Sequence, residues 1–198
     1  TVLTSSTTTA ASRILPMENA VNAAIERFGH VDILVNNAGR GYPSPLENYP
    51  LEGWRTVTAV DLDAVMMCTR DFGRHMLERG YGRIINISSV MGAGGLQEIH
   101  VAAYHACKGA VINFTRAAAA EWAERGVTVN CILPGFFESE SNSPERMEQM
   151  GGWIRSHTPM RRPGAPGELD STLLFLAAPE SSYVTGISVP CDGGWTCV

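Results

Sequence analysis

Short β-rich runs alternate with long helical segments along this chain, and this alternation limits the fold more than any other feature. The pattern predicts strands over residues 31–35, 82–88, 127–133 and 187–189. It predicts helices over residues 17–28, 51–78, 101–124 and 168–177, and a glycine follows each of the first three within two residues. Strands that alternate with helices form a parallel sheet with right-handed crossovers. The sequence therefore predicts an α/β fold, and its 198 residues suit a single domain.

Two stretches show no clear periodicity. Residues 1–12 are rich in Thr, Ser and Ala, so we expect an irregular segment there. Residues 136–152 are polar and rich in Glu and Ser, so we expect a mobile loop that contains a short helix. Both stretches lie outside the predicted strands.

Composition and charge narrow the class of protein. The formal net charge is −5 and no basic stripe is present, so we expect no nucleic-acid partner. The five cysteines are odd in number and include no Cys-x-x-Cys pair, which argues against a disulfide framework or a zinc site. No apolar run is long enough for a membrane span and no signal peptide is recognisable. We therefore expect a cytoplasmic protein without a bound metal or a membrane partner.

Tyr104 and Lys108 form the pattern that most directly indicates chemistry. They are four residues apart in a predicted helix, so their side chains share one face about one turn apart. A free phenol titrates near pH ~10, and a neighbouring ammonium favours its ionised form. A Tyr–Lys pair can therefore act as a general acid and base near neutral pH. Because the same spacing also arises on exposed helices without any function, the pair needs support from other residues.

Small and polar residues follow three predicted strands, at the edge where parallel sheets bind ligands. The second strand ends at Ser88 and Ser89, and a hydroxyl there could polarise a substrate carbonyl. A simple strand cap is the alternative. The first and third strands are followed by Asn36-Asn37-Ala38-Gly39 and by Pro134-Gly135. Small residues let a ligand approach the backbone closely, although plain turns have the same composition.

The order of these residues resembles the short-chain dehydrogenase/reductase family. The ordered set contains Asn36-Asn37-Ala38-Gly39, Ser89, Tyr104-x-x-x-Lys108, Asn130 and Pro134-Gly135. The C-terminal part adds the runs at residues 159–164, 175–177, 183–186 and 192–194. The likeness covers residues 17–198, and it is similar in detail to 3-oxoacyl-carrier-protein reductases and gluconate 5-dehydrogenases. It implies a Rossmann-like, doubly wound parallel sheet and an NAD(P)-dependent oxidoreductase that interconverts a secondary alcohol and a ketone.

The resemblance also implies roles for single residues. Tyr104 would exchange a proton with the substrate oxygen, Lys108 would make Tyr104 more acidic and hold the nicotinamide ribose, and Ser89 would orient the substrate. Residues 136–152 would cover the substrate. The cofactor would be NAD or NADP, and the residues that contact it would be Asn36, Ala38, Gly39, Tyr104, Lys108, Pro134, Gly135 and Phe137.

The family's N-terminal cofactor turn has no counterpart in this sequence. That turn, Thr-Gly-x-x-x-Gly-x-Gly, holds the pyrophosphate at a helix N-terminus, and no such run precedes Asn36. We therefore expect an N-terminally incomplete sheet that lacks two strand–helix units, or about 60 residues. The strand over residues 31–35 would then be an apolar strand at an open edge of the sheet, and we expect residues 1–12 to cover little of it. This edge favours a fragment of a longer protein over a naturally truncated one.

A second departure from the family concerns Asp61, which occupies the place of an Asn that holds a water in the family's proton relay. A carboxylate could hold the same water, but its negative charge would alter the relay. A substitution with little effect is the alternative. We therefore include Asp61 among the candidate catalytic residues, beside Ser89, Tyr104 and Lys108.

Two further hypotheses do not require redox chemistry. A lyase, an isomerase or a binding subunit on the same scaffold would be consistent with the absent cofactor turn. A structural role in an oligomer would use the apolar faces of the two long helices, which comprise Val57, Val60, Val65, Ala110, Val111, Phe114, Ala117 and Ala118. Because such helices pair between subunits in the family, we expect a homodimer or homotetramer. We also expect a small-molecule carbonyl or alcohol substrate.

Overall fold

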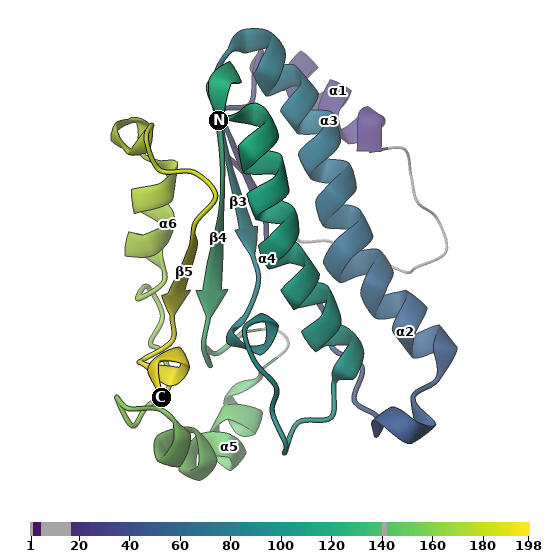
Figure 1. Ribbon diagram of the computed structural model, residues 1–198, viewed down its shortest axis with the longest axis vertical. Helices are drawn as coiled ribbons and strands as arrows, with labels where there is room; N and C mark the ends of the chain where they lie inside the picture. Colours follow the sequence, from purple (N-terminus) through teal and green to yellow (C-terminus); the bar gives the residue numbers. More distant parts are fainter. Residues whose placement is uncertain (1, 5–16, 140–141) are drawn as a thin grey trace.

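Five parallel strands form the sheet at the centre of the molecule, in the spatial order β1-β2-β3-β4-β5 (Figure 1). The structure is a computed structural model and describes residues 2–4, 17–139 and 142–198. Every strand pair is parallel, as the alternation of strands and helices predicts. The strands are β1 (Val2–Thr4), β2 (Ile33–Asn36), β3 (Gly82–Ile87), β4 (Val127–Pro134) and β5 (Ser188–Cys191).

Helices cover both faces of this sheet (Figure 1). One face carries α1 (Met17–Phe28), α3 (Ala64–Arg79) and α4 (Ala102–Trp122), and the other carries α6 (Asp170–Ala177). Successive side chains of a strand point to opposite faces. Ile84 therefore packs with α1, α3 and α4, while its neighbour Ile85 packs with Leu176 of α6. The molecule is a three-layered α/β domain.

Glycines end two of the long helices, as the sequence predicts. Gly80 follows α3 with φ 68°, and Gly126 follows α4 and the short turn η4 (Ala123–Arg125) with φ 77°. Both angles lie in the left-handed region, where a side chain is strained. A Cβ on Gly126 would also overlap the carbonyl of Gly80. The two helix ends therefore touch, and only glycine fits at their contact.

The edge of the sheet beside β2 differs from the prediction. Residues 2–4, within the stretch expected to be irregular, form β1 and pair with β2 from Ile33 to Val35. The expectation that β2 would be an open edge is therefore wrong. Val2 and Thr4 are β-branched residues of high β-propensity, and the backbone N–H and C=O groups of β2 can pair with this segment. Residues 5–12 lie outside the described part of the chain.

The long helix predicted over residues 51–78 is divided in the structure. It consists of α2 (Leu51–Thr58), the π-helical segment η2 (Ala59–Asp63) and α3. A π-helical segment inserts one extra residue into the helical turn, and such segments are frequent at functional sites. Asp61 lies in the middle of η2, so this irregularity directs one of the candidate residues inward.

The predicted mobile loop over residues 136–152 is largely helical. Helix α5 (Pro144–His157) has 14 residues, which corrects the expectation of a short helix in a loop. Its apolar residues Met147 and Ile154 are buried against Phe136, and the Phe136 ring lies 5.4 Å from the Trp153 ring. This packing stabilises a helix whose polar composition suggested a loop. Residues 140–141 of the predicted loop are outside the described residues.

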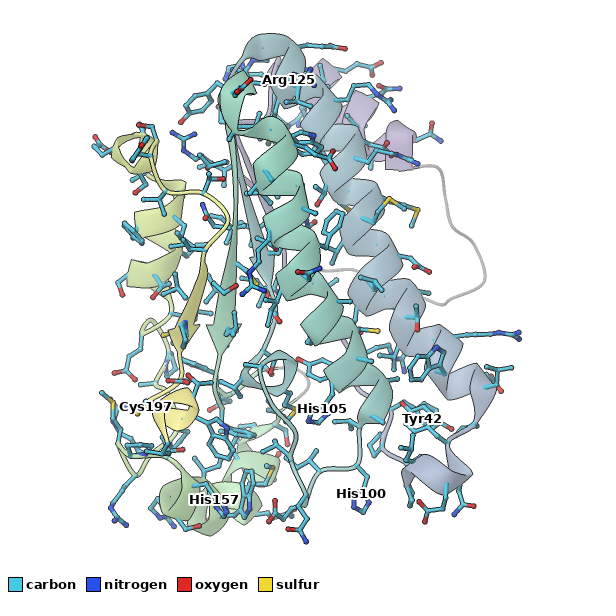
Figure 2. All side chains as sticks on the ribbon, in the orientation of Figure 1. Tyr42, His100, His105, Arg125, His157 and Cys197 are labelled. Carbon is cyan, nitrogen blue, oxygen red and sulfur yellow. The ribbon has the colours of Figure 1, made fainter. Side chains whose placement is uncertain are left out.

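The carboxyl ends of the strands lie at one end of the molecule, which is the lower end in Figure 1. The start of α4, helix α5 and the C-terminus lie at the same end. Figure 2 places His100 and His105 there and Arg125 at the opposite end. The remaining short helical turns are η1 (Leu46–Asn48), η3 (Val90–Gly92), η5 (Pro179–Ser181) and η6 (Trp195–Cys197).

Candidate active site

Lys108 lies at the centre of the candidate site, because α4 begins at the carboxyl edge of the sheet and directs this side chain inward. The side chain is buried, and its Nζ donates a hydrogen bond to the carbonyl of Ile87 over 2.9 Å. Nζ also lies 3.3 Å from Oδ1 of Asp61 and 5.3 Å from the centroid of the Tyr104 ring. The predicted proximity of Tyr104 and Lys108 is present in the structure.

Tyr104 lies one helical turn before Lys108 and is half-buried. Its ring packs against an apolar cluster that contains Val57, Ala103 and Cys107. These contacts restrict the ring while part of the side chain reaches the surface. The structure therefore places a partly exposed phenol beside a buried ammonium.

The two serines at the end of β3 have different surroundings. Ser88 is buried, and its hydroxyl donates a 2.7 Å hydrogen bond to the backbone carbonyl of Lys108. The hydroxyl of Ser89 accepts a hydrogen bond from the Met91 N–H over 3.1 Å and keeps its own proton for another acceptor. Ser89 can therefore donate to a substrate oxygen, whereas Ser88 fixes α4 to the end of β3. This arrangement supports the prediction of Ser89 rather than Ser88.

Asp61 reaches the same site from η2. Its side chain is fully buried, and its Oδ2 accepts a hydrogen bond from the backbone N–H of Arg40 over 3.0 Å. Burial raises the pKa of Asp61 above its usual value, while the charge of Lys108 and the Arg40 N–H oppose this rise. The structure thus brings Asp61 and Lys108 together as an ion pair without access to solvent.

Asn36 has an internal role. Its side chain is buried, and its amide donates hydrogen bonds to the Thr69 hydroxyl over 3.0 Å and to Oδ1 of Asn86 over 2.8 Å. Asn86 in turn donates to the Thr115 hydroxyl on α4. This network joins β2, β3, α3 and α4 behind the site. The Oδ1 of Asn36 is buried and has no hydrogen-bond partner among the described residues, and the predicted contact of Asn36 with a cofactor stays a prediction.

The residues Ala38 and Gly39 follow β2 and border the ion pair. Gly39 is exposed, and a Cβ added to it would lie 2.9 Å from Oδ1 of Asp61 and 3.2 Å from Nζ of Lys108. Ala38 is half-buried beside it. Because glycine has no Cβ, the backbone at position 39 can pass this close to both charged groups.

The turn after β4 meets the C-terminal strand. The Gly135 N–H donates to the carbonyl of Cys191, and a Cβ on Gly135 would lie 2.8 Å from Cα of Asp192. Pro134 is half-buried at the end of β4, and the ring of Phe137 packs over Gly164. The close contact with Asp192 thus explains why residue 135 is a glycine without any ligand. Pro134 and Phe137 lie at the carboxyl edge of the sheet, where a ligand was predicted.

A cleft of about 510 Å³ opens on the side of the site where α4 begins. It lies between residues 43–45 after β2, residues 98–100 before α4, and the α5 residues Gln149, Met150 and Trp153. Figure 2 shows His100 at this end of the molecule. The segment predicted to cover the substrate therefore supplies one wall of a cleft.

Three features of the site have no clear signal in the sequence. The carbonyl of Ile87 holds Lys108, Gly39 borders the ion pair, and the π-helical geometry of η2 directs Asp61 inward. Backbone carbonyls and close approaches depend on which strands are neighbours, so residue patterns alone do not reveal them. The sequence singled out Gly39 and Asp61 as residues, but not these relations between them.

The described residues fit the nicotinamide end of a dinucleotide. A lysine ammonium has three N–H groups, and the bond to Ile87 and the contact with Asp61 leave one for a ribose hydroxyl. The half-buried ring of Tyr104 lies beside it. No Thr-Gly-x-x-x-Gly-x-Gly run is present in the 198 residues, so we assign no pyrophosphate contact to this chain.

Within the described ranges, no group of His, Cys, Asp and Glu side chains has the arrangement of a metal site. None of the helices described there combines the length and the apolar character that crossing a bilayer requires. All five cysteines are free thiols, and burial raises the pKa of Cys68 and of Cys131 to about 11.

The chain is similar to known proteins over nearly all of its length. A family model described as "Enoyl-(Acyl carrier protein) reductase" matches residues 12–196. A galactitol 2-dehydrogenase (L-tagatose-forming) of Cereibacter sphaeroides is 42% identical over 179 residues, which cover 89% of this chain and 70% of the relative. A 2-dehydro-3-deoxy-D-gluconate 5-dehydrogenase of Bacillus subtilis is 41% identical over 177 residues, with 88% and 69% covered.

Solved structures of dehydrogenases are also similar to this chain. The structure of a gluconate 5-dehydrogenase from Burkholderia cenocepacia in complex with NADP and tartrate has a TM-score of 0.83 and 36% sequence identity. The comparison covers 91% of this chain and 71% of that one. The expected Rossmann-like doubly wound sheet is therefore confirmed.

These matches place the chain in the short-chain dehydrogenase/reductase family. A 3-oxoacyl-[acyl-carrier-protein] reductase of Synechocystis and a gluconate 5-dehydrogenase of Gluconobacter oxydans, at 37% and 38% identity, belong to the two groups that the motifs resemble. The expected class, NAD(P)-dependent oxidoreductases that act on alcohols and ketones, is confirmed at the level of the family. The relatives named here are all dehydrogenases or reductases, and none supports the non-redox hypothesis.

Proposed function

We propose that this protein interconverts a secondary alcohol and a ketone, with NAD or NADP as the hydride carrier and Tyr104 as general acid and base. The observation that carries the proposal is the contact of Tyr104 and Lys108 at the edge of the sheet where the free hydroxyl proton of Ser89 also lies. When bound, the nicotinamide supplies or accepts the hydride. The residues of the chain orient the reacting groups and move the proton.

Each residue contributes a separate part of this reaction. Ser89 donates a hydrogen bond to the substrate oxygen and polarises the carbonyl. In the direction of reduction, Tyr104 donates its proton to the same oxygen as negative charge develops there. Lys108 stabilises the phenolate that remains and donates to the ribose of the cofactor. Pro134 and Phe137 would border the nicotinamide, and Ala38 and Gly39 would lie along the adenosine side.

The substrate class follows from the cleft and from the relatives. The cleft beside the start of α4 exposes Ser44, Glu98, His100 and Gln149, which offer hydrogen bonds to hydroxyl or carboxylate groups. The relatives named above are dehydrogenases of galactitol and of sugar acids, or acyl-carrier-protein reductases. We therefore propose a small polar alcohol or ketone, with polyols and sugar acids as the first candidates.

Turnover of a substrate panel tests this function. The complete gene product is assayed with NAD, NADP and their reduced forms against galactitol, gluconate, their keto products and acetoacetyl thioesters. We expect turnover, and we expect Tyr104→Phe to lower kcat/KM at least roughly 10²-fold while the circular dichroism spectrum stays unchanged. Absence of both turnover and a change in NAD(P)H fluorescence on mixing would contradict the proposal. Cofactor-independent activity that Tyr104→Phe abolishes would instead indicate a lyase or isomerase.

We also propose that residues 1–198 are the catalytic and C-terminal part of one dinucleotide-binding domain. The matches support this proposal because they span about 70% of each relative. The absent Thr-Gly-x-x-x-Gly-x-Gly run supports it as well. The reading frame upstream of Thr1 provides the test, since we expect it to encode a strand, a glycine-rich turn and a helix. A stop codon directly upstream, with no such segment, would contradict the proposal.

The assembly and the location of the protein are proposals of the same kind. We propose a homo-oligomer, a dimer or a tetramer, that acts in the cytoplasm. The long helices support a homo-oligomer only in part, because four residues of the predicted pairing faces are buried inside this chain: Val57, Val65, Val111 and Ala118. The predicted pairing faces are therefore narrower than the sequence suggests, although Ala117 is exposed on α4. Free thiols at all five cysteines are consistent with a reducing compartment.

A further inference from the structure

The Asp61 carboxylate has surroundings that a structural hydrogen-bond acceptor does not need. Its Oδ2 accepts the Arg40 N–H, which satisfies one oxygen. Its Oδ1 is buried, lies 3.3 Å from Nζ of Lys108, and has no well-directed hydrogen bond among the described residues. A Cβ added to Gly39 would lie 2.9 Å from this oxygen, so the chain at residue 39 passes close to it. The contact between Oδ1 and Lys108 is therefore mainly one of charge with charge.

This charge is costly to bury. Desolvation raises the pKa of Asp61, and the opposing attraction of Lys108 does not cancel that effect. An asparagine has nearly the same shape and could accept the same hydrogen bond from Arg40. The ionised carboxylate is therefore disfavoured at this position relative to its protonated form. What holds it there as a charge is the buried ammonium of Lys108, 3.3 Å away.

We propose that Asp61 is a positioning residue for Lys108, and that its negative charge sets how strongly the Lys108 charge acts on Tyr104. The proposal rests on the proposed function, because it concerns the pH dependence of the same proton transfer. While Asp61 is ionised, the pair has no net charge, so Lys108 attracts the developing phenolate less strongly. With Asp61 neutralised, the full positive charge of Lys108 acts on Tyr104.

The charged and titratable groups around Asp61 come from three elements. Lys108 and Cys107 lie on α4, Arg40 lies in the segment after β2, and Asp63 lies on η2 itself. Burial raises the pKa of Cys107, and the charges of Asp61 and Asp63 raise it further. Lys108 is the cation whose side chain contacts the carboxylate, so substitution of Asp61 changes one ion pair directly.

The pH profile of kcat/KM, measured in the direction of alcohol oxidation, tests the role of the charge. In Asp61→Asn we expect the rising limb of the profile to move to lower pH by roughly one unit, because an opposite charge within reach of a titrating group shifts it by at least this amount. Asp63→Asn is the matched control, since Asp63 is an exposed carboxylate in the same segment, and we expect its profile to coincide with the wild type. If Asp61→Asn turns over substrate and its pH profile of kcat/KM coincides with that of the wild type, the proposal is wrong.

Thermal unfolding without cofactor gives a second readout that does not depend on activity. The folded-state pKa of Asp61 is raised above 3.8, so its contribution to stability is fully present below that pH and is lost as the pH rises through the raised value. The Asp61→Asn variant has no carboxyl group at this position, so its stability does not decrease in this way as the pH rises. We therefore expect the Tm of the variant, relative to wild type, to increase between pH 4 and pH 7.

The two readouts separate failure of this proposal from failure of the proposed function. A wild-type protein without turnover overturns the function and, with it, the catalytic role of the pair. Turnover together with an Asp61→Asn profile that coincides with the wild type overturns only the present proposal. A shifted profile, together with a Tm difference from wild type that rises between pH 4 and pH 7, supports it.

Discussion

Single residues at the carboxyl edge of the sheet divide into those to which we assign the reaction and those that hold these residues in place. Lys108 reaches Tyr104 because the Ile87 carbonyl and the Asp61 carboxylate fix its ammonium. Ser88 binds the backbone of Lys108, while the neighbouring Ser89 keeps a free hydroxyl proton. The two adjacent serines therefore have different hydrogen-bond partners, because successive side chains of an extended segment point in opposite directions.

Alanine at each serine should separate these two functions. Ser89→Ala is expected to lower kcat by roughly 10²-fold, since it removes a hydrogen-bond donor to the substrate oxygen. Ser88→Ala is expected to lower the free energy of unfolding by about 1 kcal/mol, since it removes a buried hydrogen bond to the Lys108 carbonyl. Steady-state kinetics and urea unfolding of both variants measure the difference. A larger kinetic defect in Ser88→Ala than in Ser89→Ala would contradict the assignment.

At the scale of the elements, packing between helices determines which glycines are required. Gly73 lies in α3 directly against the indole of Trp122 at the end of α4, where an added Cβ would be 2.5 Å from the ring. Gly152 lies in α5 and has no atom within 4 Å of the position of an added Cβ. Both glycines lower helix propensity, but only Gly73 lets two helices approach each other.

Alanine substitution at these two glycines should have opposite effects. Gly73→Ala is expected to lower the free energy of unfolding by about 1–3 kcal/mol, because the added methyl group displaces Trp122. Gly152→Ala is expected to raise it by about 0.5–1 kcal/mol, because alanine favours the helix and meets no neighbour. Thermal or urea unfolding of the two variants provides the measurement. Stabilisation by Gly73→Ala would show that α3 and α4 are less closely packed than described.

At the scale of the whole molecule, the sheet has one edge at β5, and apolar side chains are exposed beside it. Leu174 and Phe175 are exposed on α6, and Tyr183 and Ile187 are exposed on the segment that leads to β5. Exposed apolar side chains that gather near an edge strand indicate an interface. Tyr104 and Lys108 lie on α4, which covers the face of the sheet opposite to α6, so association through this surface is expected to leave the candidate site accessible.

Loss of this surface should change the oligomeric state. The wild-type protein is expected to be a dimer or a tetramer, and Phe175→Lys is expected to shift it towards smaller species because a charge cannot be buried there without a partner. Leu46→Lys is the control, since Leu46 is an exposed apolar residue on η1, away from α6 and β5. Size-exclusion chromatography with light scattering measures the mass. A wild-type monomer would contradict this prediction.

Local sequence patterns were sufficient for much of the fold. The helix over residues 17–28 agrees in both ends with α1, and the strands β2, β3 and β4 lie within two residues of their predicted bounds. Hydrophobic periodicity and helix-ending glycines are properties of short segments, so they can be recognised without knowing which other segments pack nearby. The pairing of β1, the length of α5 and the π-helical segment η2 depend on contacts with distant segments, and the periodicity did not reveal them.

The sequence by itself determined the class of fold, because hydrophobic periodicity specifies strands and helices. It also gave Tyr104 and Lys108 as candidates through their helical spacing, and the resemblance to the family added Asp61 and the choice of Ser89. The tertiary structure alone decided how these residues relate. It showed that the Ile87 carbonyl holds Lys108 and that Asp61 pairs with Lys108 in the interior. It also showed that the Asn36 amide donates a hydrogen bond to Asn86 on the neighbouring strand. These relations depend on distances between segments far apart in the chain, and such distances exist only once the strands have paired and the helices have packed.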